Sequence, residues 1–316
     1  MSRYARTILL LLMILSGGRF RGTKTHLLMG FLDVCWQSVR TQIRRIQEKV
    51  GKDMSEPFIL TITNAVATIS INDAPHNRMM LEYIDALEEQ LPSLRDDERI
   101  RALVFTAEGL EHFSVGMNLK QFAEGAERKG GADGLLDQRL RVLNMIESLG
   151  KPSIATLFGY CLGGGLELPL ACHFRLAADE GAQIGLPEMD LGGVPAWGGS
   201  ARLPRCVGRN HALDMILRGR KIDGQEALRI GLVSEICPLS TLKERAQAFG
   251  EELAKQPRLA IKGMLETIIG FESKGLAESI LDERAAVRQT RGTADAQEGM
   301  RAFLEKRRPV FNQAPD

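Results

Sequence analysis

The stretch that decides the fold is GYCLGGGLELPLACHFRLAADEGAQIGLPEMD, which spans residues 159–190. It places three glycines, Gly163 to Gly165, between the strand-like run SIATLF and the apolar, helix-like run LELPLAC. The first backbone N–H groups of a helix lack intrahelical partners and carry a partial positive charge. Glycines leave these groups open to close approach. The stretch therefore predicts either a site for a negative oxygen or close packing of a helix on a strand.

A second candidate donor lies earlier, in the turn HFSVGMNL (112–119), where the N–H of Met117 follows a glycine. Together with the triple glycine, this turn predicts a two-donor oxyanion hole. Two glutamates accompany the donors: Glu167 falls in the first turn of the helix, and Glu188 lies in the apolar segment GLPEMDLGG. Burial raises the pKa of a carboxyl, which suits proton transfer near neutral pH. The alternative for each glutamate is a solvated surface charge.

The rest of the chain from residue 57 alternates strands and helices. FILTIT and VATISI predict a hairpin around Asn64-Ala65. Periodicity predicts buried strands at 101–107 and 153–158, and helices at 79–94 and 135–148. The charged, Gly-rich segment EGAERKGGADG (124–134) predicts a mobile surface loop. Beyond Gly198 the pattern is mostly helical, and it closes with four helices near 240–254, 257–270, 275–290 and 294–306. This order predicts an α/β core with a helical C-terminal appendage.

Charge and cysteine usage exclude several classes of function. Of the 41 Lys and Arg, ten lie in residues 1–53, and of the 40 Asp and Glu only three do, so residues 54–316 carry 31 against 37. This mildly acidic body argues against a nucleic-acid partner. Five cysteines without a CxxC pair indicate reduced thiols and a cytoplasmic location. Scattered histidines without HExxH predict no metal site.

The first 53 residues differ from the rest in composition. ILLLLMIL followed by Ser16-Gly17-Gly18 resembles a secretory signal, but the apolar run is too short to span a bilayer, which needs about 20 residues. The segment is a signal or anchor, an ordered addition, or sequence upstream of a true start at Met54. We expect the last of these, with no membrane partner, because charge balance and periodicity change at Met54.

Six segments between residues 57 and 311 carry a resemblance to a known family: APHNRMM, HFSVGMNL, KPSIATLFGYCLGGGLEL, GLPEMDLGGVPAWGGSARLPRCVG, ALRIGLVSEI and AQEGMRAFLEKRRPVF. With them the chain resembles the crotonase (enoyl-CoA hydratase/isomerase) superfamily. The resemblance implies an α/β fold, a crotonase-like spiral of ββα units with a C-terminal helical trimerisation region. It divides the chain into an N-terminal extension (1–53), a spiral core (54–250) and a helical oligomerisation region (251–316). It also implies a homotrimer, or trimers paired into a hexamer.

The same resemblance implies the substrate, an acyl-coenzyme A thioester, and its site. Carried over by position, the N–H groups of Met117 and Gly164 hold the thioester carbonyl oxygen, while Glu167 and Glu188 flank the substrate double bond. The resemblance assigns eight further positions to substrate binding: Asn77, Arg78, Met79, Asn118, Leu119, Trp197, Phe303 and Lys306. Neither a metal nor a redox cofactor is required, since coenzyme A enters as part of the substrate.

Some positions depart from the family pattern. Arg78 replaces a frequent Ala, Asn118 replaces the usual Asp, and Trp197 stands where small residues are common. Trp197 either caps the acyl pocket or packs beneath the loop. Between Glu167 and Glu188 there is one residue more than in familiar hydratases, and an error of about 1 Å in position can cost 100-fold in rate.

These residues predict hydration of a trans-2-enoyl thioester. By resemblance, Glu167 orients and deprotonates water for attack on Cβ, and Glu188 delivers the proton to Cα. One alternative is a Δ3-Δ2 enoyl-CoA isomerase, which needs only one glutamate to move a proton. Other thioester chemistry on the same oxyanion site is a further alternative. A non-catalytic scaffold or RNA-binding protein on the same fold is another, which the glutamate pair and the acidic body oppose.

Overall fold

The computed structural model describes residues 56–271 and 274–313. The prediction for residues 1–53 lies outside the described residues. Six strands form the main sheet in the order β1-β2-β3-β4-β6-β8, and two short strands form a second sheet, β5-β7. The strands are β1 (Phe58–Thr63), β2 (Val66–Ile71), β3 (Ala102–Ala107), β4 (Ser153–Leu157), β5 (Tyr160–Leu162), β6 (Phe174–Ala178), β7 (Gln183–Gly185) and β8 (Glu235–Cys237).

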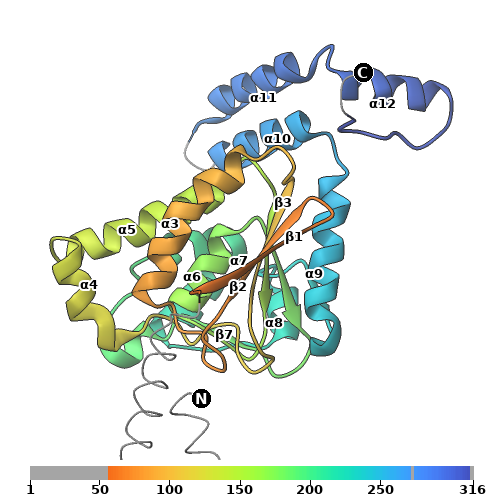
Figure 1. Cartoon of the computed structure of the whole chain (residues 1–316). Coiled ribbons are helices and arrows are strands. Elements are labelled where there is room, and N and C mark those ends of the chain that lie inside the picture. The colour runs from red at the N-terminus through yellow and green to blue at the C-terminus, as the bar shows by residue number, and fades with distance from the viewer. Residues whose placement is uncertain (1–55, 272–273, 314–316) are drawn as a thin grey trace, which may run out of the picture. The chain divides into compact units, whose positions relative to one another are not determined.

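Helices cover the main sheet on both faces (Figure 1), with α3 and α5 on one side and α9 on the other. The α-helices of the described chain are α3 (Leu81–Asp96), α4 (Phe122–Arg128), α5 (Ala132–Glu147), α6 (Gly164–Ala171), α7 (Gly199–Leu217), α8 (Gly224–Arg229), α9 (Leu239–Ala254), α10 (Arg258–Phe271), α11 (Leu276–Thr290) and α12 (Ala294–Leu304). Two 3₁₀ turns, η1 (Leu119–Gln121) and η2 (Glu188–Leu191), lie in the loops that carry predicted site residues.

The predicted hairpin is confirmed. β1 pairs antiparallel with β2, and the two residues between them, Asn64 and Ala65, have φ of 50° and 65°. Two consecutive positive φ values are the geometry of the tight turn that matches the twist of paired strands. The remaining neighbours in the main sheet are parallel. Strand β3 is buried along its whole length, as expected for a strand covered on both faces.

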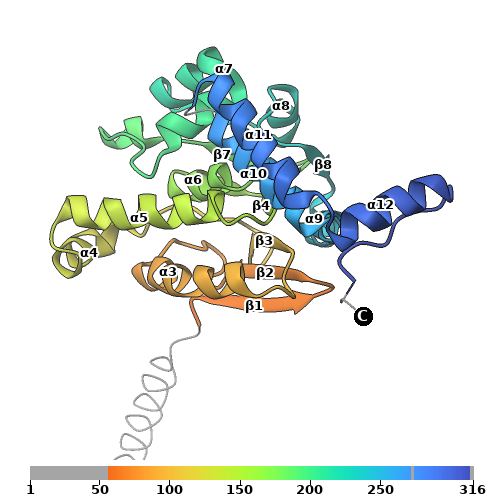
Figure 2. The ribbon, with the colours of Figure 1, turned by 90° about the horizontal axis from the view of Figure 1, so that it is seen from above.

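A second layer of strand pairing makes the fold a spiral. β5 follows β4, β7 follows β6, and the two short strands pair in parallel. Parallel bridges between Ser114 and Cys161 and between Met79 and Met117 extend the same pattern to earlier turns of the chain. Each turn of the chain thus places a short segment beside the same segment of the next turn. Figure 2 shows the resulting layers from above. The predicted spiral of ββα units is confirmed.

The prediction of a mobile loop over 124–134 is wrong. Residues Phe122–Arg128 form α4, and α5 begins at Ala132 rather than near 135. Ion pairs hold α4 in place, since Arg128 pairs with Glu124 one turn earlier and Lys129 Nζ lies 2.7 Å from Asp85 Oδ1 of α3. Gly125 faces α3 so closely that an added Cβ would lie 2.7 Å from Leu81 Cδ2. A charged segment with glycines is therefore a packed helix here.

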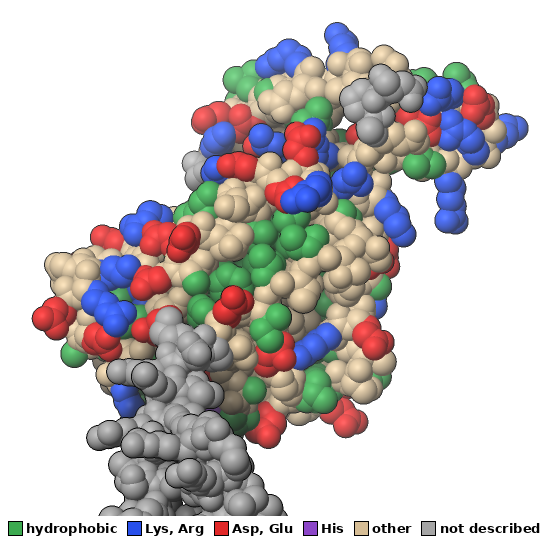
Figure 3. All heavy atoms as spheres, viewed as in Figure 1, with side chains coloured by type: hydrophobic (Ala, Val, Ile, Leu, Met, Phe, Trp, Pro, Cys, Tyr) green, Lys and Arg blue, Asp and Glu red, His purple; other side chains and the backbone are tan. Residues whose placement is uncertain are grey.

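Helices α10, α11 and α12 confirm the helical prediction for the C-terminal part of the chain. α10 packs against α11, whereas α12 is closed by its own ion pairs: Glu298 Oε2 accepts from Arg301 Nη2 at 2.6 Å and from Arg307 Nη2 at 2.9 Å. Many large apolar side chains of this region face solvent, and Figure 3 shows apolar side chains there among charged ones. Within the described residues, no helix is both long enough and apolar enough to cross a membrane.

Candidate active site

The triple glycine of the opening stretch makes a sharp entry from β5 into α6. Gly163 has φ 54° and ψ −125°, a conformation that side-chain-bearing residues rarely adopt, and its N–H donates to Gly185 O at 3.1 Å. A Cβ on Gly165 would lie 2.5 Å from Ser114 O. Position 165 therefore requires glycine because of close packing, and position 163 requires glycine because of its backbone conformation. Gly164, between them, is the first residue of α6.

Two unpaired backbone donors lie side by side at this point. Gly116 has φ 95°, and a Cβ on it would lie 3.6 Å from the Gly164 nitrogen, so the next peptide N–H along, that of Met117, is close to Gly164. Met79 N–H donates to Gly116 O at 2.9 Å, which fixes the turn. Within residues 56–271 and 274–313, neither the Met117 nor the Gly164 N–H donates to a protein acceptor. The pair has the geometry of an oxyanion hole.

Glu167 lies one turn into α6 and is 2% exposed. Its Oε1 accepts from the backbone N–H of Trp197 at 2.8 Å and of Gly199 at 2.9 Å. Burial raises the pKa of Glu167 to about 7, while these two hydrogen bonds favour the ionised form and the nearby Glu188 opposes it. The carboxyl is thus held in one orientation and titrates near neutral pH.

Glu188 begins η2 and faces the same glycines. Its Oε1 would lie 3.0 Å from a Cβ on Gly163. Its Oε2 is buried and has no hydrogen-bond partner in the described part of the chain. Burial raises the pKa of Glu188 above its ordinary value. A charge on Glu188 contributes to the raised pKa of Glu167, so the two carboxyls lie close enough to interact electrostatically. The predicted pairing of Glu167 and Glu188 beside the donors is what the structure contains.

Trp197 is buried against the donor glycine. The indole Cζ3 would lie 2.5 Å from a Cβ on Gly164, and the indole is 3% exposed. The backbone N–H of the same residue holds Glu167. Of the two sequence interpretations, a cap on the acyl pocket and packing beneath the loop, this contact places the ring directly beside the predicted donor. The ring therefore limits the space next to the oxyanion hole.

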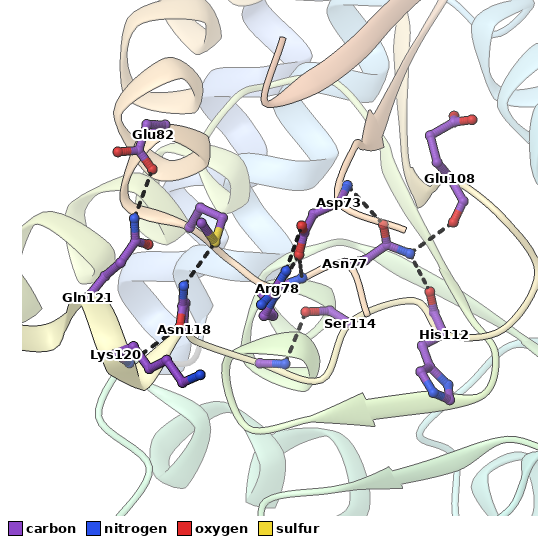
Figure 4. A network of polar contacts seen from close by, with 12 residues as sticks. Asp73, Asn77, Arg78, Glu82, Glu108, His112, Ser114, Asn118, Lys120 and Gln121 are labelled. Carbon is purple, nitrogen blue, oxygen red and sulfur yellow. Dashed lines mark hydrogen bonds and ion pairs between the residues drawn. The ribbon is translucent and has the colours of Figure 1, made fainter. Parts of the chain in front are cut away.

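The residues of the APHNRMM segment are arranged by a polar network (Figure 4). Asn77 is fully buried, and its Nδ2 donates to Glu108 O at 2.9 Å and to His112 O at 2.7 Å. Arg78 binds Asp73 through Nε at 2.7 Å and Nη2 at 2.9 Å. Side chains of this segment thus join the loops that carry the site. Of Asn77, Arg78 and Met79, the three residues predicted to contact the substrate here, only Arg78 presents a charged group near the surface.

Asn118 and Leu119 follow the Met117 donor. Asn118 Oδ1 caps η1 by accepting from Lys120 N–H at 3.3 Å, and its Nδ2 contacts Met80 Sδ at 3.2 Å. Leu119 is 61% exposed. Asn118 therefore fixes the segment after the donor, and Leu119 leaves an apolar side chain at the surface beside it.

The structure does not bring Phe303 and Lys306 to the glutamates within one chain. Both lie at the end of α12, which is distant from α6 in both views (Figures 1 and 2), and Phe303 is 78% exposed. His173, next to α6, has a structural role: its Nδ1 accepts from Ser153 N–H at 3.0 Å, and burial lowers the pKa of His173 to about 4.

Comparison with known proteins identifies the family. The model of the enoyl-CoA hydratase/isomerase family matches residues 61–314. The chain belongs to this family. It is 35% identical over 255 residues to a protein of Bacillus subtilis (strain 168) named "Probable enoyl-CoA hydratase", covering 80% of this chain and 97% of that one. A protein of Mycobacterium tuberculosis (strain CDC 1551 / Oshkosh) named "Probable enoyl-CoA hydratase echA8" is 34% identical over 261 residues, covering 81% of this chain and 98% of that one.

The fold of this enoyl-CoA hydratase/isomerase family member has solved counterparts. The crystal structure of the enoyl-CoA hydratase from Bacillus anthracis matches with a TM-score of 0.76 and 33% identity, covering 81% of this chain and 98% of that chain. A Pseudomonas aeruginosa structure titled DspI matches with a TM-score of 0.77 and 32% identity, covering 82% and 97%. These likenesses support the crotonase fold for the described core and its C-terminal helices.

The sequence did not reveal two parts of this family member's site. The N–H groups that hold Glu167 come from Trp197 and Gly199, and only the run AWGGS signals a close backbone approach there. Arg139 of α5, fully buried, lies over the Trp197 ring at 5.9 Å from its centroid. Nothing in the sequence separates this arginine from its solvated neighbours. Among the described residues, no cluster of three or more His, Cys, Asp or Glu is placed to hold a metal ion.

Proposed function

We propose that this protein is an enoyl-CoA hydratase, which adds water across the double bond of a trans-2-enoyl-CoA thioester. One arrangement carries the proposal: the buried carboxyl of Glu167 and the half-buried carboxyl of Glu188 lie beside two backbone N–H groups that have no acceptor in the described chain. Membership of the hydratase/isomerase family supports it, as does the name "Probable enoyl-CoA hydratase" of the Bacillus subtilis relative.

The two donors bind the thioester carbonyl oxygen. Negative charge develops on this oxygen when water attacks Cβ and an enolate-like intermediate forms. Donors that are already oriented stabilise this charge without reorganisation, and each contributes about 3–4 kcal/mol in comparable sites. Met117 and Gly164 are assigned this role. Trp197, packed on Gly164, keeps the site apolar, which strengthens the interaction.

The glutamates divide the proton transfers between them. Glu167 accepts two N–H bonds, which favour its ionised form, so it acts as the base that orients and deprotonates water. Glu188 has an oxygen without a partner in the described chain and a pKa raised by burial, and both favour the protonated form that delivers a proton to Cα. Hydroxide adds to Cβ, the Cα–Cβ double bond becomes the enolate, and Glu188 protonates Cα. The proton that Glu167 took from water is then released to solvent, and Glu188 takes one up from solvent, so both residues return to their starting states.

We further propose that a second copy completes the coenzyme A site. Phe303 and Lys306 are too far from the glutamates to act within one chain, whereas the α10–α12 region exposes a set of large apolar side chains: Met264, Ile268, Phe271, Leu276, Ile280, Leu281, Val287, Met300, Phe303, Leu304 and Val310. An apolar surface of this kind supports self-association. In a homotrimer, or in paired trimers, α12 of one copy meets the thioester site of another.

The test is an absorbance assay with crotonyl-CoA, because hydration removes the conjugated double bond. Purified full-length protein is expected to consume crotonyl-CoA and to release 3-hydroxybutyryl-CoA, which chromatography identifies. A 3-enoyl-CoA substrate is assayed beside it. Shifting of the 3-enoyl double bond with no hydration of the 2-enoyl thioester contradicts the hydratase proposal and assigns the isomerase reaction instead. No reaction with either thioester contradicts both.

A further inference from the structure

Three buried arginines in this chain have different surroundings. Arg175 donates to three carbonyl oxygens, of Leu232, Pro169 and Cys172, at 2.6, 3.2 and 2.6 Å. Arg202 binds the side chains of Glu147 and Asn144 at 2.9 and 2.6 Å and donates to Trp197 O. Arg139 is fully buried, yet only its Nη1 has partners, Leu135 O and Gln138 Oε1. Its Nε and Nη2 have no partner in the described residues.

The carboxylates nearest to Arg139 are already occupied by other groups. Asp85 Oδ1 accepts from Lys129 Nζ and from Gln138 Nε2, both at 2.7 Å. Glu88 accepts from Gln138 and from Arg141, also at 2.7 Å. They attract the guanidinium from a distance, but burial outweighs them and lowers the pKa of Arg139. A buried cation without paired donors is costly. In the site itself, Glu188 Oε2 shows the same combination of burial and missing partner.

The unpaired atoms of Arg139 are those of one edge. Nε and Nη2 lie on the side of the guanidinium that binds a carboxylate with two parallel hydrogen bonds. Two surface pairs in this chain use the same edge: Arg78 binds Asp73 at 2.7 and 2.9 Å, and Arg245 binds Glu235 at 2.8 and 2.8 Å. Arg139 leaves this edge open.

The position of Arg139 relates it to the thioester site. Its Cζ lies 5.9 Å from the centroid of a Trp197 ring. The same indole also packs against Gly164, one of the two candidate oxyanion donors. The Trp197 ring therefore lies next to both the guanidinium and the place where the thioester carbonyl is proposed to bind.

We propose that Arg139 binds a carboxylate at the far end of the acyl group, so that the preferred substrate is the coenzyme A thioester of a short unsaturated dicarboxylic acid. The proposal rests on the thioester site of the proposed function. The terminal carboxylate accepts from Nε and Nη2 together. It reaches them when the Trp197 indole rotates about its side-chain torsions away from Gly164, while the Trp197 backbone stays bound to Glu167.

Binding of saturated thioesters to the full-length protein tests the proposal without requiring catalysis. Pentanoyl-CoA is compared with glutaryl-CoA, and hexanoyl-CoA with adipoyl-CoA, so that each pair has the same number of acyl carbons. Isothermal titration is expected to show about 10- to 100-fold tighter binding of the dicarboxylic member in at least one pair, the size of a charge-assisted double hydrogen bond. Arg139→Met, which keeps most of the volume, is expected to remove this preference.

Arg139→Lys is the second variant, because it keeps the charge but lacks the two-donor edge. It is expected to retain only part of the preference, and it serves alone if Arg139→Met does not fold by circular dichroism. Equal affinity within both pairs in the wild-type protein overturns the proposal. The proposal is also overturned if a folded Arg139 variant loses the same affinity for both members of a pair. An arginine that only positions Trp197 would give this result. A dicarboxylic preference without hydration of any enoyl-CoA instead sinks the hydratase proposal and leaves this one standing.

Discussion

Helices α6 and α11 differ in how their apolar side chains are covered. All eight residues of α6 are buried, and a Cβ on either of its glycines would lie 2.5 Å from a neighbour, Trp197 Cζ3 for Gly164 and Ser114 O for Gly165. In α11, by contrast, only Ser279 and Ala286 of fifteen residues are buried, while Leu276 is 68% and Leu281 is 60% exposed. α6 is enclosed by its own chain, whereas α11 packs on α10 and leaves large apolar side chains exposed in the described residues. We therefore assign catalysis to the region around α6 and self-association to the region around α11.

The largest expected effect is on the catalytic rate, and it comes from the glutamates in the region around α6. Glu167→Gln and Glu188→Gln are each expected to lower kcat for crotonyl-CoA hydration by about 100-fold or more, because each removes one proton transfer. The binding of a saturated thioester is expected to persist, since the oxyanion donors are backbone groups. Stopped-flow absorbance measures the first quantity and titration calorimetry measures the second. The double variant is expected to be little worse than the poorer single one; full hydration by either single variant contradicts the two-carboxyl mechanism.

Two glycine substitutions compare the regions directly. Gly164→Ala forces a Cβ to within 2.5 Å of the Trp197 indole, whereas Gly275→Ala at the start of α11 meets nothing within 4 Å. Gly164→Ala is expected to lower kcat/KM by about 10- to 100-fold, because a shift of about 1 Å at the reacting centre is costly. Gly275→Ala is expected to leave kcat/KM unchanged. If both substitutions changed kcat/KM to a similar extent, the proposed difference in packing between Gly164 and Gly275 would be contradicted.

Charges on the exposed apolar faces test the assembly region. Ile268→Asp and Leu281→Asp place a carboxylate on side chains that are 63% and 60% exposed, so the fold of a single chain tolerates them. Each is expected to dissociate the oligomer in analytical ultracentrifugation and to raise KM by about 10-fold, because a contact with coenzyme A from a second copy is lost. Leu217→Asp, at 59% exposure on α7, is the control. A monomeric wild-type protein with an unchanged KM in all variants contradicts the assembly proposal.

A smaller effect concerns stability rather than rate. The pKa of Glu167 is raised from its ordinary 4.5 to about 7 by burial, so the folded protein binds this proton more tightly than the unfolded chain. The stabilisation is complete below 4.5 and is lost as the pH rises through 7. Glu167→Gln avoids this loss. The Tm of Glu167→Gln minus that of the wild type is therefore expected to increase by a few degrees from about pH 5 to about pH 8. A constant difference contradicts the raised pKa.

The sequence predicted those features that depend on local pattern. Periodicity located the hairpin at Asn64-Ala65 and the C-terminal helices, and the GGG run with Glu167 located the site. Segment 124–134 was mistaken for a loop because its stabilising partners, Glu82 and Asp85 of α3, are distant in sequence. Short strands such as β8 have too few residues to show a period. Arg139 was missed because a charged residue is expected at the surface, and only tertiary packing buries it.

The proposed oxyanion donors of this chain are peptide groups, and this has a consequence for its evolutionary history. No exchange of a side chain at Met117 removes its N–H except replacement by proline, and Gly164 is restricted mainly by the volume of Trp197. The carboxyls of Glu167 and Glu188, in contrast, are each lost by a single codon change. A descendant of this protein can therefore lose or exchange its proton-transfer groups while it keeps the ability to polarise a thioester. Selection can therefore change the reaction that such a protein catalyses more readily than it can change the binding of acyl thioesters.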